Sequence, residues 1–276
     1  MIIINNKKDL QAFMEKKPVN KKIGFVPTMG CIHQGHISLI KMSKKDGCLT
    51  CVSIFVNPTQ FNDKKDFISY PINEKKDLEI LDKNGCEIVF LPSVNEIYPY
   101  GTKAIRKVKK YRNILCDSFR PGHFDGVTTV VSNLLNIINA DFAYFGEKDY
   151  QQLKIIEELV KIEKSKTKII PCLSIRYKNG ISISSRYKFL NKEQKNKLKN
   201  ISKVLINTVN SIRNNFDIKK TIFKCRSDLF KEGINKIDYI ELRDNDTLKK
   251  IDKVINARLF IALYLDDIRI IDNFII

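Results

Sequence analysis

Strand-like and helix-like segments alternate through the larger, N-terminal part of this 276-residue chain. The expected strands, read from β-branched and apolar runs, are Lys22–Val26, Leu49–Val56, Glu87–Leu91, Phe142–Phe145 and Thr167–Cys172. The expected helices are His36–Lys45, Glu74–Asn84, Gly126–Ile138 and Tyr150–Ile162. Such alternation predicts an α/β fold with a Rossmann-like parallel sheet and flanking helices. Ligands of these sheets bind at the carboxyl ends of the strands.

The pattern changes after Leu190. A polar-faced helix is expected over Asn191–Arg213, with Asn191 as its N-cap, and a second helix over about Thr221–Lys231. Three strand-like runs follow, at Asp238–Arg243, Arg258–Leu265 and Arg269–Asp272. We therefore expect a first domain at residues 1–177 and a smaller C-terminal α+β domain at residues 178–276.

The formal net charge of +18 suits a nucleic-acid binder or a protein that acts on anions. The lysines are spread along the chain, however, and form no basic stripe with interleaved aromatic residues. No apolar run reaches the roughly 18 residues that a membrane span needs, and MIIINNKKDL lacks the order of a signal peptide. We expect a cytoplasmic protein whose partners include neither nucleic acid nor membrane.

Seven cysteines without regular spacing argue against a disulfide framework. Cys48 and Cys51 form a CxxC pair, which is a metal or redox signal in other contexts. They lie in LTCVSIFV, which is typical of a buried strand, where residues three apart face opposite sides. We expect structural thiols.

The segment PTMGCIHQGH, Pro27–His36, carries the strongest chemical signal. A strand ends, a glycine turn follows, and His33 and His36 flank a glycine where a helix begins. Helix N-termini present free N–H groups and a positive dipole end, and two imidazoles at i and i+3 can face one anion. The alternatives are incidental histidines at a helix start and two zinc ligands, but no further ligand stands at a matching spacing. A nucleotide phosphate site is favoured.

Two further segments leave the choice open. SIFVNPTQF places Asn57 and Gln60 at the end of a strand, as ligand-binding amides or as an ordinary Asn-Pro turn. RPGHFDGVTTVV places Arg120 and His123 before an apolar helix, as an anion site or as a plain loop.

Charged and hydroxyl groups crowd two other segments. In FGEKDYQQ, Lys148 opposes the dipole of the helix it precedes, which favours a phosphate contact over a solvated cap, and Asp149 is a candidate for Mg²⁺. In NGISISSR, Ser184, Ser185 and Arg186 suit phosphate oxygens, although a hydroxyl-rich strand end is the better interpretation when the segment is taken alone. KMSKK at Lys41–Lys45 resembles a synthetase ATP loop but falls inside a helix, so we interpret it as helix surface.

Together these segments, in this order and with Tyr70-Pro71, IDYIELRDNDTL and RIIDN, resemble the pantoate–β-alanine ligase family from about Ile23 to Asn273. HxGH alone would indicate only the wider nucleotidylyltransferase superfamily. The resemblance implies condensation of pantoate with β-alanine through a pantoyl-adenylate, which releases AMP and pyrophosphate. ATP is then a substrate accompanied by Mg²⁺, and family members are usually homodimers. The sequence leaves open whether the smaller domain closes over ATP.

The resemblance also implies residue roles. His36, as proton donor, with His33, Lys148 and Arg186 would be catalytic. ATP would be bound by Pro27, Thr28, Met29, Gly30, Cys31, Ile32, His33, Gln34, Gly35, His36, Gly146, Glu147, Lys148, Asp149, Ile175, Ile183, Ser184, Ser185 and Arg186. Pantoate and β-alanine would be held by Gln60, Gln152 and Asn57. Mg²⁺ would approach Asp149.

The sequence departs from the family pattern at four places. Ile72 stands where arginine is usual, Asn179 where aspartate is usual, Tyr187 follows SSR in place of asparagine, and Cys31 replaces a small residue. None of these departures removes a group assigned to chemistry. Two other classes stay open from sequence: a plain nucleotidylyltransferase, and a nucleic-acid binder suggested by the charge.

Overall fold

The structure, a computed structural model, describes residues 1–61, 67–68 and 70–276, which pack as two compact units. The first unit comprises Met1–Arg112, Arg120–Glu147 and Gln152–Leu173. The second comprises Asn113–Phe119, Lys148–Gln151 and Ser174–Ile276. Two short segments from the first part of the chain thus pack with the second unit. The division into functional domains at residues 177 and 178 stays a prediction.

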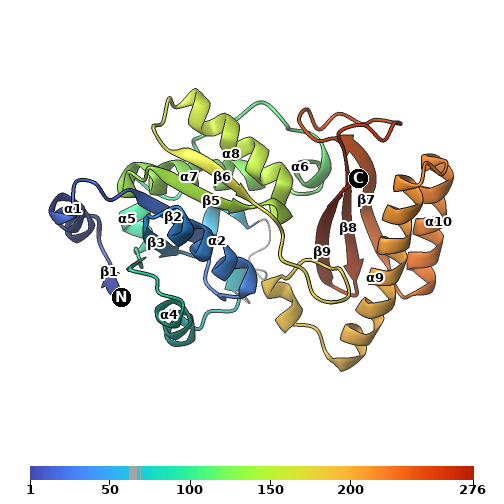
Figure 1. The fold of residues 1–276 in the computed structure, drawn as a ribbon, viewed down its shortest axis with the longest axis horizontal. Helices are drawn as coiled ribbons and strands as arrows, with labels where there is room; N and C mark the ends of the chain where they lie inside the picture. Colours follow the sequence, from blue (N-terminus) through green and yellow to red (C-terminus); the bar gives the residue numbers. More distant parts are fainter. Residues whose placement is uncertain (62–66, 69) are drawn as a thin grey trace. The chain divides into compact units, whose positions relative to one another are not determined.

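The first unit is built on a six-stranded sheet in the order β1-β4-β3-β2-β5-β6, with every neighbouring pair parallel (Figure 1). The strands are β1 (Ile2–Ile4), β2 (Ile23–Thr28), β3 (Leu49–Ile54), β4 (Ile88–Phe90), β5 (Phe142–Gly146) and β6 (Lys168–Cys172). The predicted parallel sheet is therefore confirmed. The sequence interpretation missed β1, because three apolar residues are too few to show a period.

Helices cover both faces of this sheet. They are α1 (Lys7–Lys16), α2 (Gln34–Lys45), α4 (Glu74–Lys83), α5 (Val94–Ile97), α7 (His123–Ile138) and α8 (Tyr150–Ile162), whose first two residues belong to the second unit. Right-handed crossovers place α2 and α4 on one face and α1, α7 and α8 on the other. Apolar side chains of α2, α4 and the strands, among them Ile40, Leu81 and Val52, form one continuous buried cluster.

The order of the strands reverses direction at β2, which pairs with β3 on one side and β5 on the other. In an open parallel sheet, such a reversal leaves a crevice outside the carboxyl ends of the strands. The segments that follow Thr28, Ile54 and Gly146 begin at that edge. These are the segments in which the sequence places its polar motifs.

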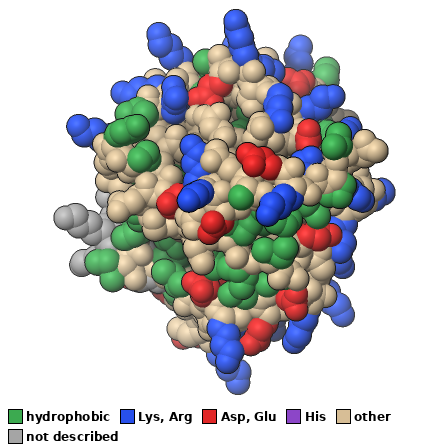
Figure 2. Space-filling model, turned by 90° about the vertical axis from the view of Figure 1, so that its left-hand side faces the viewer, with side chains coloured by type: hydrophobic (Ala, Val, Ile, Leu, Met, Phe, Trp, Pro, Cys, Tyr) green, Lys and Arg blue, Asp and Glu red, His purple; other side chains and the backbone are tan. Residues whose placement is uncertain are grey.

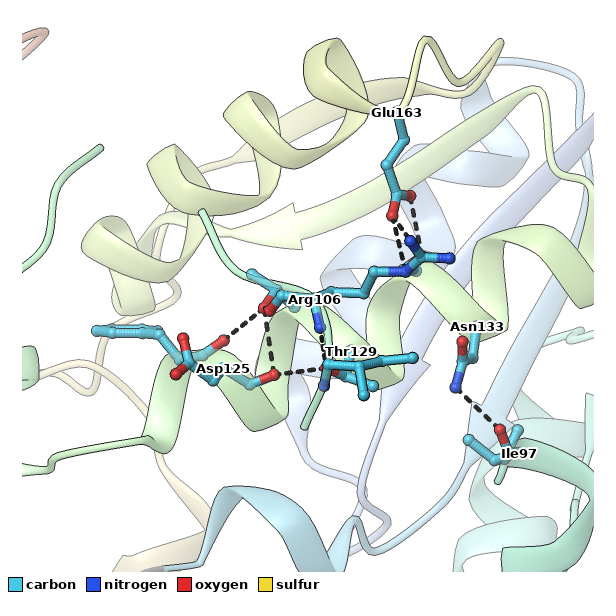
Figure 3. A network of polar contacts seen from close by, with 10 residues as sticks. Ile97, Arg106, Asp125, Thr129, Asn133 and Glu163 are labelled. Carbon is cyan, nitrogen blue, oxygen red and sulfur yellow. Dashed lines mark hydrogen bonds and ion pairs between the residues drawn. The ribbon is translucent and has the colours of Figure 1, made fainter. Parts of the chain in front are cut away.

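One side of α7 holds the chain that precedes it. Ile105 N and Arg106 N both donate to Thr129 Oγ1, at 3.0 and 2.9 Å, and Arg106 also pairs with Glu163 at 3.4 Å (Figure 3). Asn133 Nδ2 donates to the Ile97 carbonyl at 2.9 Å. Side-chain hydrogen bonds thus fix a long irregular connection onto a rigid helix.

The second unit contains a three-stranded antiparallel sheet in the order β7-β8-β9. Its elements are α6 (Leu115–Phe119), the short helix η3 (Ser185–Lys188), α9 (Lys192–Arg213), α10 (Ile218–Lys231), β7 (Lys236–Asp244), β8 (Ala257–Leu265) and β9 (Ile268–Ile275). Asn191 caps α9 through a full capping box with Gln194, which confirms the expected N-cap. The smaller α+β fold is also confirmed, with an apolar cluster between the sheet and its two long helices.

All seven cysteines are free and buried. Burial raises the pKa of the Cys86 thiol to about 12 and that of Cys172 to about 11, and it also raises the pKa of Cys48 and Cys51. Neutral buried thiols are poor nucleophiles and poor metal ligands, and the expectation of structural thiols for the CxxC pair stays a prediction. Among the described helices, none combines the length and apolar character of a membrane span.

Close packing between β2 and α2 leads to a stability prediction at Gly24. A Cβ at this residue would lie 2.1 Å from Ser43 Oγ and 2.9 Å from Cys48 Cβ. Gly24→Ala should therefore destabilise the protein by about 1–3 kcal/mol in urea unfolding, as overpacked cores do. In a double-mutant cycle with Ser43→Ala, the combined loss in unfolding free energy should be smaller than the sum of the two single losses. Strictly additive losses in unfolding free energy would contradict this packing.

Candidate active site

The loop between β2 and α2 has an unusual backbone. Gly30 has φ of +80° and Cys31 has φ of +55°, so two successive residues adopt the left-handed region. For Cys31 this conformation costs free energy that surrounding contacts must offset. Thr28 contributes one such contact, because its hydroxyl accepts from Gly30 N at 3.1 Å and donates to the Ser53 carbonyl at 2.8 Å.

The carboxylate of Asp77 closes this loop. Its two oxygens accept hydrogen bonds from Cys31 N and Ile32 N, each at 2.7 Å, and the residue is only 3% exposed. Successive N–H groups in such a turn form an anion-binding nest, and here the anion is a side chain of α4. The N–H groups of Cys31 and Ile32 are therefore engaged by the protein itself. No sequence pattern indicates this role for Asp77.

The two histidines lie together at the start of α2. The helix begins at Gln34, two residues before the expected start, because His33 acts as N-cap and its Nδ1 accepts from Gly35 N at 3.1 Å. A neutral His33 then carries its proton on Nε2. The rings of His33 and His36 stack with centroids 4.0 Å apart and planes 16° apart. This geometry brings two imidazoles to one helix N-terminus, as the spacing predicted.

Asn57 and Gln60 lie at the end of β3, around the short helix η1 (Pro58–Gln60). The buried Asn57 amide donates to Gln60 Oε1 at 3.0 Å, and its oxygen accepts from the Tyr98 hydroxyl at 2.6 Å. Burial raises the pKa of Tyr98, which keeps that hydroxyl a donor. Gln60 Nε2 lies 2.8 Å from Met29 Sδ. Both ends of the Asn57 amide thus have protein partners, so its contribution is to place the Gln60 side chain beside Met29.

The two adjacent glutamines of α8 differ in role. Gln151 is buried, accepts from Cys116 N at 2.9 Å and donates to the Ile114 carbonyl at 2.9 Å, all within the second unit. Gln152 is half-buried in the first unit. Its predicted contact with pantoate stays a prediction.

In the second unit, Lys148 and Asp149 lie on the short helix η2 (Glu147–Asp149), with Lys148 Nζ 3.8 Å from Asp149 Oδ2. The Lys148 carbonyl accepts from Asn273 Nδ2 at 2.9 Å. Arg258 bonds the Asn273 side chain and stacks its guanidinium 3.7 Å from the centroid of Tyr150. Strands β8 and β9 therefore hold the segment that carries the predicted catalytic lysine.

The segment from Ile175 to Arg186 is a tight hairpin of the second unit. Ile183 N donates to the Ile175 carbonyl at 2.9 Å, so two predicted ATP contacts are neighbours. Ser184 caps η3 by accepting from Arg186 N at 3.3 Å, and Arg186 Nη1 reaches the Arg269 carbonyl at 3.4 Å.

A buried carboxylate anchors the same hairpin. Oδ2 of Asp272 accepts from Ser182 N at 2.9 Å and from Arg176 Nη1 at 3.0 Å, and Oδ1 accepts from the Ser182 hydroxyl. Asp272 and Asn273 were noticed only within the family run RIIDN. Their positioning roles could not be predicted from local spacing, since Ser182 and Lys148 are 90 and 125 residues away from them.

The departures from the family pattern have simple structural settings. Ile72 is 71% exposed, and Asn179 keeps the turn before Gly180 by accepting from Ile181 N at 3.2 Å. Tyr187 is buried in the apolar cluster of the second unit and packs on Tyr177 with ring centroids 5.3 Å apart. Cys31 is buried, and its left-handed backbone is held by the hydrogen bond from Cys31 N to Asp77.

Within the first unit, therefore, the structure brings together Met29, Asn57 and Gln60, and separately the pair His33 and His36. Within the second unit it brings together Lys148 and Asp149. The hairpin of the same unit leads into Ser184–Arg186. The meeting of the two sets at one triphosphate stays a prediction.

Comparison with known proteins agrees with these motifs over the whole chain. Residues 2–275 match the family model for pantoate-beta-alanine ligase. The chain belongs to the pantoate–β-alanine ligase family. A pantothenate synthetase from Endomicrobium trichonymphae is 44% identical over 278 residues, which cover 99% of this chain and 97% of the relative. A pantothenate synthetase from Caldicellulosiruptor bescii is 39% identical over 284 residues, which cover 100% of this chain and 99% of the relative.

Solved structures of this ligase family have the same fold. A pantothenate synthetase from Thermus thermophilus superposes with a TM-score of 0.92 at 29% identity, covering 100% of this chain and 99% of that one. The structure of a pantoate–β-alanine ligase from Francisella tularensis, complexed with beta-gamma ATP and β-alanine, superposes with a TM-score of 0.84 at 38% identity. The match covers 100% of this chain and 97% of that one. The chain is thus an enzyme of this ligase family, which serves pantothenate biosynthesis.

One face of this family member shows how its charged side chains are distributed. On the face that Figure 2 shows, the described lysine and arginine side chains are scattered, with aspartate and glutamate among them. A scattered distribution gives no track for a nucleic-acid backbone on that face.

The carboxylate clamp on the glycine loop leads to a stability prediction. Asp77→Asn keeps one acceptor oxygen but turns an NH₂ group toward a backbone N–H, so a buried donor loses its partner. We expect a loss of about 1–3 kcal/mol in the free energy of unfolding, measured in urea. Asp82→Asn on the same helix removes only the ion pair between the N-terminus and a carboxylate that is 65% exposed, and it should cost less than about 1 kcal/mol. Equal losses for both variants would contradict the clamp.

Proposed function

We propose that the enzyme condenses pantoate with β-alanine in an ATP-dependent reaction that proceeds through pantoyl-adenylate and releases AMP and pyrophosphate. The observation that carries the proposal is the stacked pair His33 and His36 at the N-terminus of α2, which follows a sheet strand and a clamped glycine loop. Two imidazoles and a helix N-terminus suit developing negative charge on phosphate oxygens. The family membership and the substrates named for the Francisella ligase support the same reaction.

In the first step a carboxylate oxygen of pantoate attacks the α-phosphorus of ATP. A new O–P bond forms, the bond to the bridging oxygen breaks, and pyrophosphate leaves with the electron pair. No protein nucleophile is needed. His36 is the expected proton donor to the phosphates, and His33, Lys148 and Arg186 would balance the remaining charge.

In the second step the neutral amine of β-alanine attacks the acyl carbon of the adenylate. The new C–N bond becomes an amide, the C–O bond to AMP breaks, and the surplus proton of the amine passes to water. Gln60 would contact both acids, and Gln152 would contact pantoate. Glutamine offers both a donor and an acceptor, which suits a substrate with hydroxyl and carboxylate groups.

ATP would be held by two sets of groups. The first unit offers Met29 to His36 together with Gly146 and Glu147, whereas the second offers Lys148, Asp149, Ile175 and Ile183–Arg186. Closure of the smaller domain over ATP would exclude water from a hydrolysable acyl-adenylate. A homodimer and a cytoplasmic location complete the proposal.

Mg²⁺ fits this arrangement as a companion of ATP. Among the described residues, no group of three or more His, Cys, Asp or Glu side chains gathers to hold a metal. The side chain of Asp149 is 45% exposed and stands beside Lys148. One carboxylate together with substrate phosphates is the usual way in which proteins bind Mg²⁺. We therefore treat MgATP as the substrate, with Asp149 as the side chain nearest to its metal.

Loss of a phosphate-facing cation should affect turnover rather than folding. His36→Ala and Lys148→Ala should each lower kcat about 100-fold to 1,000-fold, because each removes a group that stabilises charge in the transition state. AMP release from ATP, pantoate and β-alanine measures the rate, and thermal melting measures stability. Lys161→Ala, which removes an exposed lysine from the C-terminal end of α8, is the control and should leave both quantities unchanged.

Unchanged turnover in either active-site variant would contradict the assigned roles. The same assay separates the ligase from a plain nucleotidylyltransferase. A ligase forms AMP only when pantoate and β-alanine are both supplied in turnover amounts, whereas a transferase accumulates a stable nucleotidyl product without an amine. Accumulation of such a product would overturn the proposed function.

A further inference from the structure

The segment RPGHFDG, Arg120–Gly126, has no role in the chemistry described above. Its sequence left an anion site and a plain loop equally open. In the structure it ends at the first turn of α7, and its residues belong to the first unit together with Asn57, Thr59 and Gln60. Apart from one contact between Arg120 and His123, its contacts used below are made to the turn that carries Gln60.

His123 contacts the backbone of Gln60 directly. Its Nδ1 lies 2.7 Å from the Gln60 carbonyl oxygen, and the side chain is almost completely buried. A carbonyl oxygen only accepts, so Nδ1 must carry the proton and donate it. Arg120 Nη1 lies 3.2 Å from His123 Nε2. A guanidinium only donates, so Nε2 accepts, and both contacts are met at once by the neutral Nδ1–H tautomer.

Arg120 makes a second contact with the same carbonyl. Its Nη2 donates to the Gln60 oxygen at 3.3 Å. The carbonyl of Gln60 thus receives one hydrogen bond from an imidazole and one from a guanidinium, and the imidazole is itself oriented by that guanidinium. Two donors on one carbonyl fix both the position and the direction of the peptide unit that carries the Gln60 side chain.

Gly126 allows this approach. A Cβ at residue 126 would lie 2.3 Å from the Thr59 carbonyl oxygen and 2.8 Å from Gln60 N, both of them backbone atoms that cannot move aside. The Gly126 carbonyl also accepts from Asn57 Nδ2 at 3.2 Å. The helix and the turn therefore touch backbone to backbone on the same side as the His123 contact.

We propose that Arg120 and His123 are positioning residues for Gln60, and that they set the substrate-holding amide for pantoate. The proposal rests on the role of Gln60 in the function proposed above. Neither residue is assigned a contact with substrate. A shift of about 1 Å in a substrate-holding group is enough to cost about 100-fold in rate, so loss of the carbonyl contacts should be felt in pantoate use. Asp77 holds the ATP loop at Cys31 and Ile32, and Gln60 contacts it only at Met29, so ATP use should change far less than pantoate use.

The test uses two replacements that keep different nitrogens of His123. The amide nitrogen of asparagine can take the place of Nδ1, whereas the longer glutamine places its amide near Nε2. His123→Gln should lower kcat/KM for pantoate about 100-fold and leave the KM for ATP within about twofold of the wild type. His123→Asn should stay within about tenfold for pantoate, because it retains the donor to the carbonyl of Gln60.

The matched control is Asn133→Ala. Asn133 also lies on α7 and also donates to a backbone carbonyl, but that carbonyl belongs to Ile97. It should lower the melting temperature about as much as His123→Gln without changing the KM for pantoate. A His123→Gln enzyme with unchanged kcat/KM for pantoate would overturn the proposal. An equal fall in kcat/KM for pantoate and for ATP would overturn it as well.

A second variant covers the case in which His123→Gln does not fold. Arg120 is only half-buried, and Arg120→Gln removes both guanidinium contacts. It should raise the KM for pantoate selectively, and an unchanged value would overturn the proposal. Failure of the proposed function is separate, because it would appear as wild-type enzyme that makes no AMP from pantoate and β-alanine.

Discussion

A buried carboxylate determines the backbone of the loop after β2, and the position of both imidazoles follows from it. Asp77 accepts from Cys31 N and Ile32 N, which holds a left-handed pair of residues in place immediately before α2. His33 can then act as N-cap, and the stacked His36 ring lies one turn into the helix. The free energy cost of the strained loop is offset within the protein, so the two imidazoles are oriented without a ligand, as the proposed phosphate contacts require.

In the segment that follows β3, a side chain predicted to hold substrate is also oriented by hydrogen bonds within the protein. Asn57 is buried with partners at both ends of its amide, and Gln60 is fixed through its side chain by Asn57 and through its carbonyl by Arg120 and His123. Side chains that hold a ligand are most accurate when rigid elements and further hydrogen bonds support them. In the second unit, Asn273 and Asp272 of β9 support Lys148 and the hairpin before Arg186 in the same way.

Most of the fold could be predicted from the sequence because its periodic segments are long. The boundaries of α8 agree to the residue, and β8 and α9 differ by a single residue. The short elements β1, α5 and α6 were missed, since three to five residues carry no period. The ten-residue helix α1 was missed as well. The start of α2 was misplaced by two residues because a histidine, rather than serine, threonine, aspartate or asparagine, provides the N-cap.

The candidate site was predictable where its residues are adjacent in sequence, as in the glycine loop with its two histidines. Asp77 could not be found, because a carboxylate inside a charged helix shows no local sign that it is buried against a distant loop. The role of RPGHFDG could not be chosen for a similar reason. Its partner, the Gln60 carbonyl, is a backbone atom and leaves no trace in side-chain spacing.

The central claim is that these groups activate a carboxylate at the α-phosphorus of ATP before any amine takes part. Exchange of labelled pyrophosphate into ATP, measured without β-alanine, tests it most directly. We expect exchange that depends on pantoate and is lost in His36→Ala and Lys148→Ala. Net formation of AMP by the complete reaction, with no pantoate-dependent exchange, would contradict it.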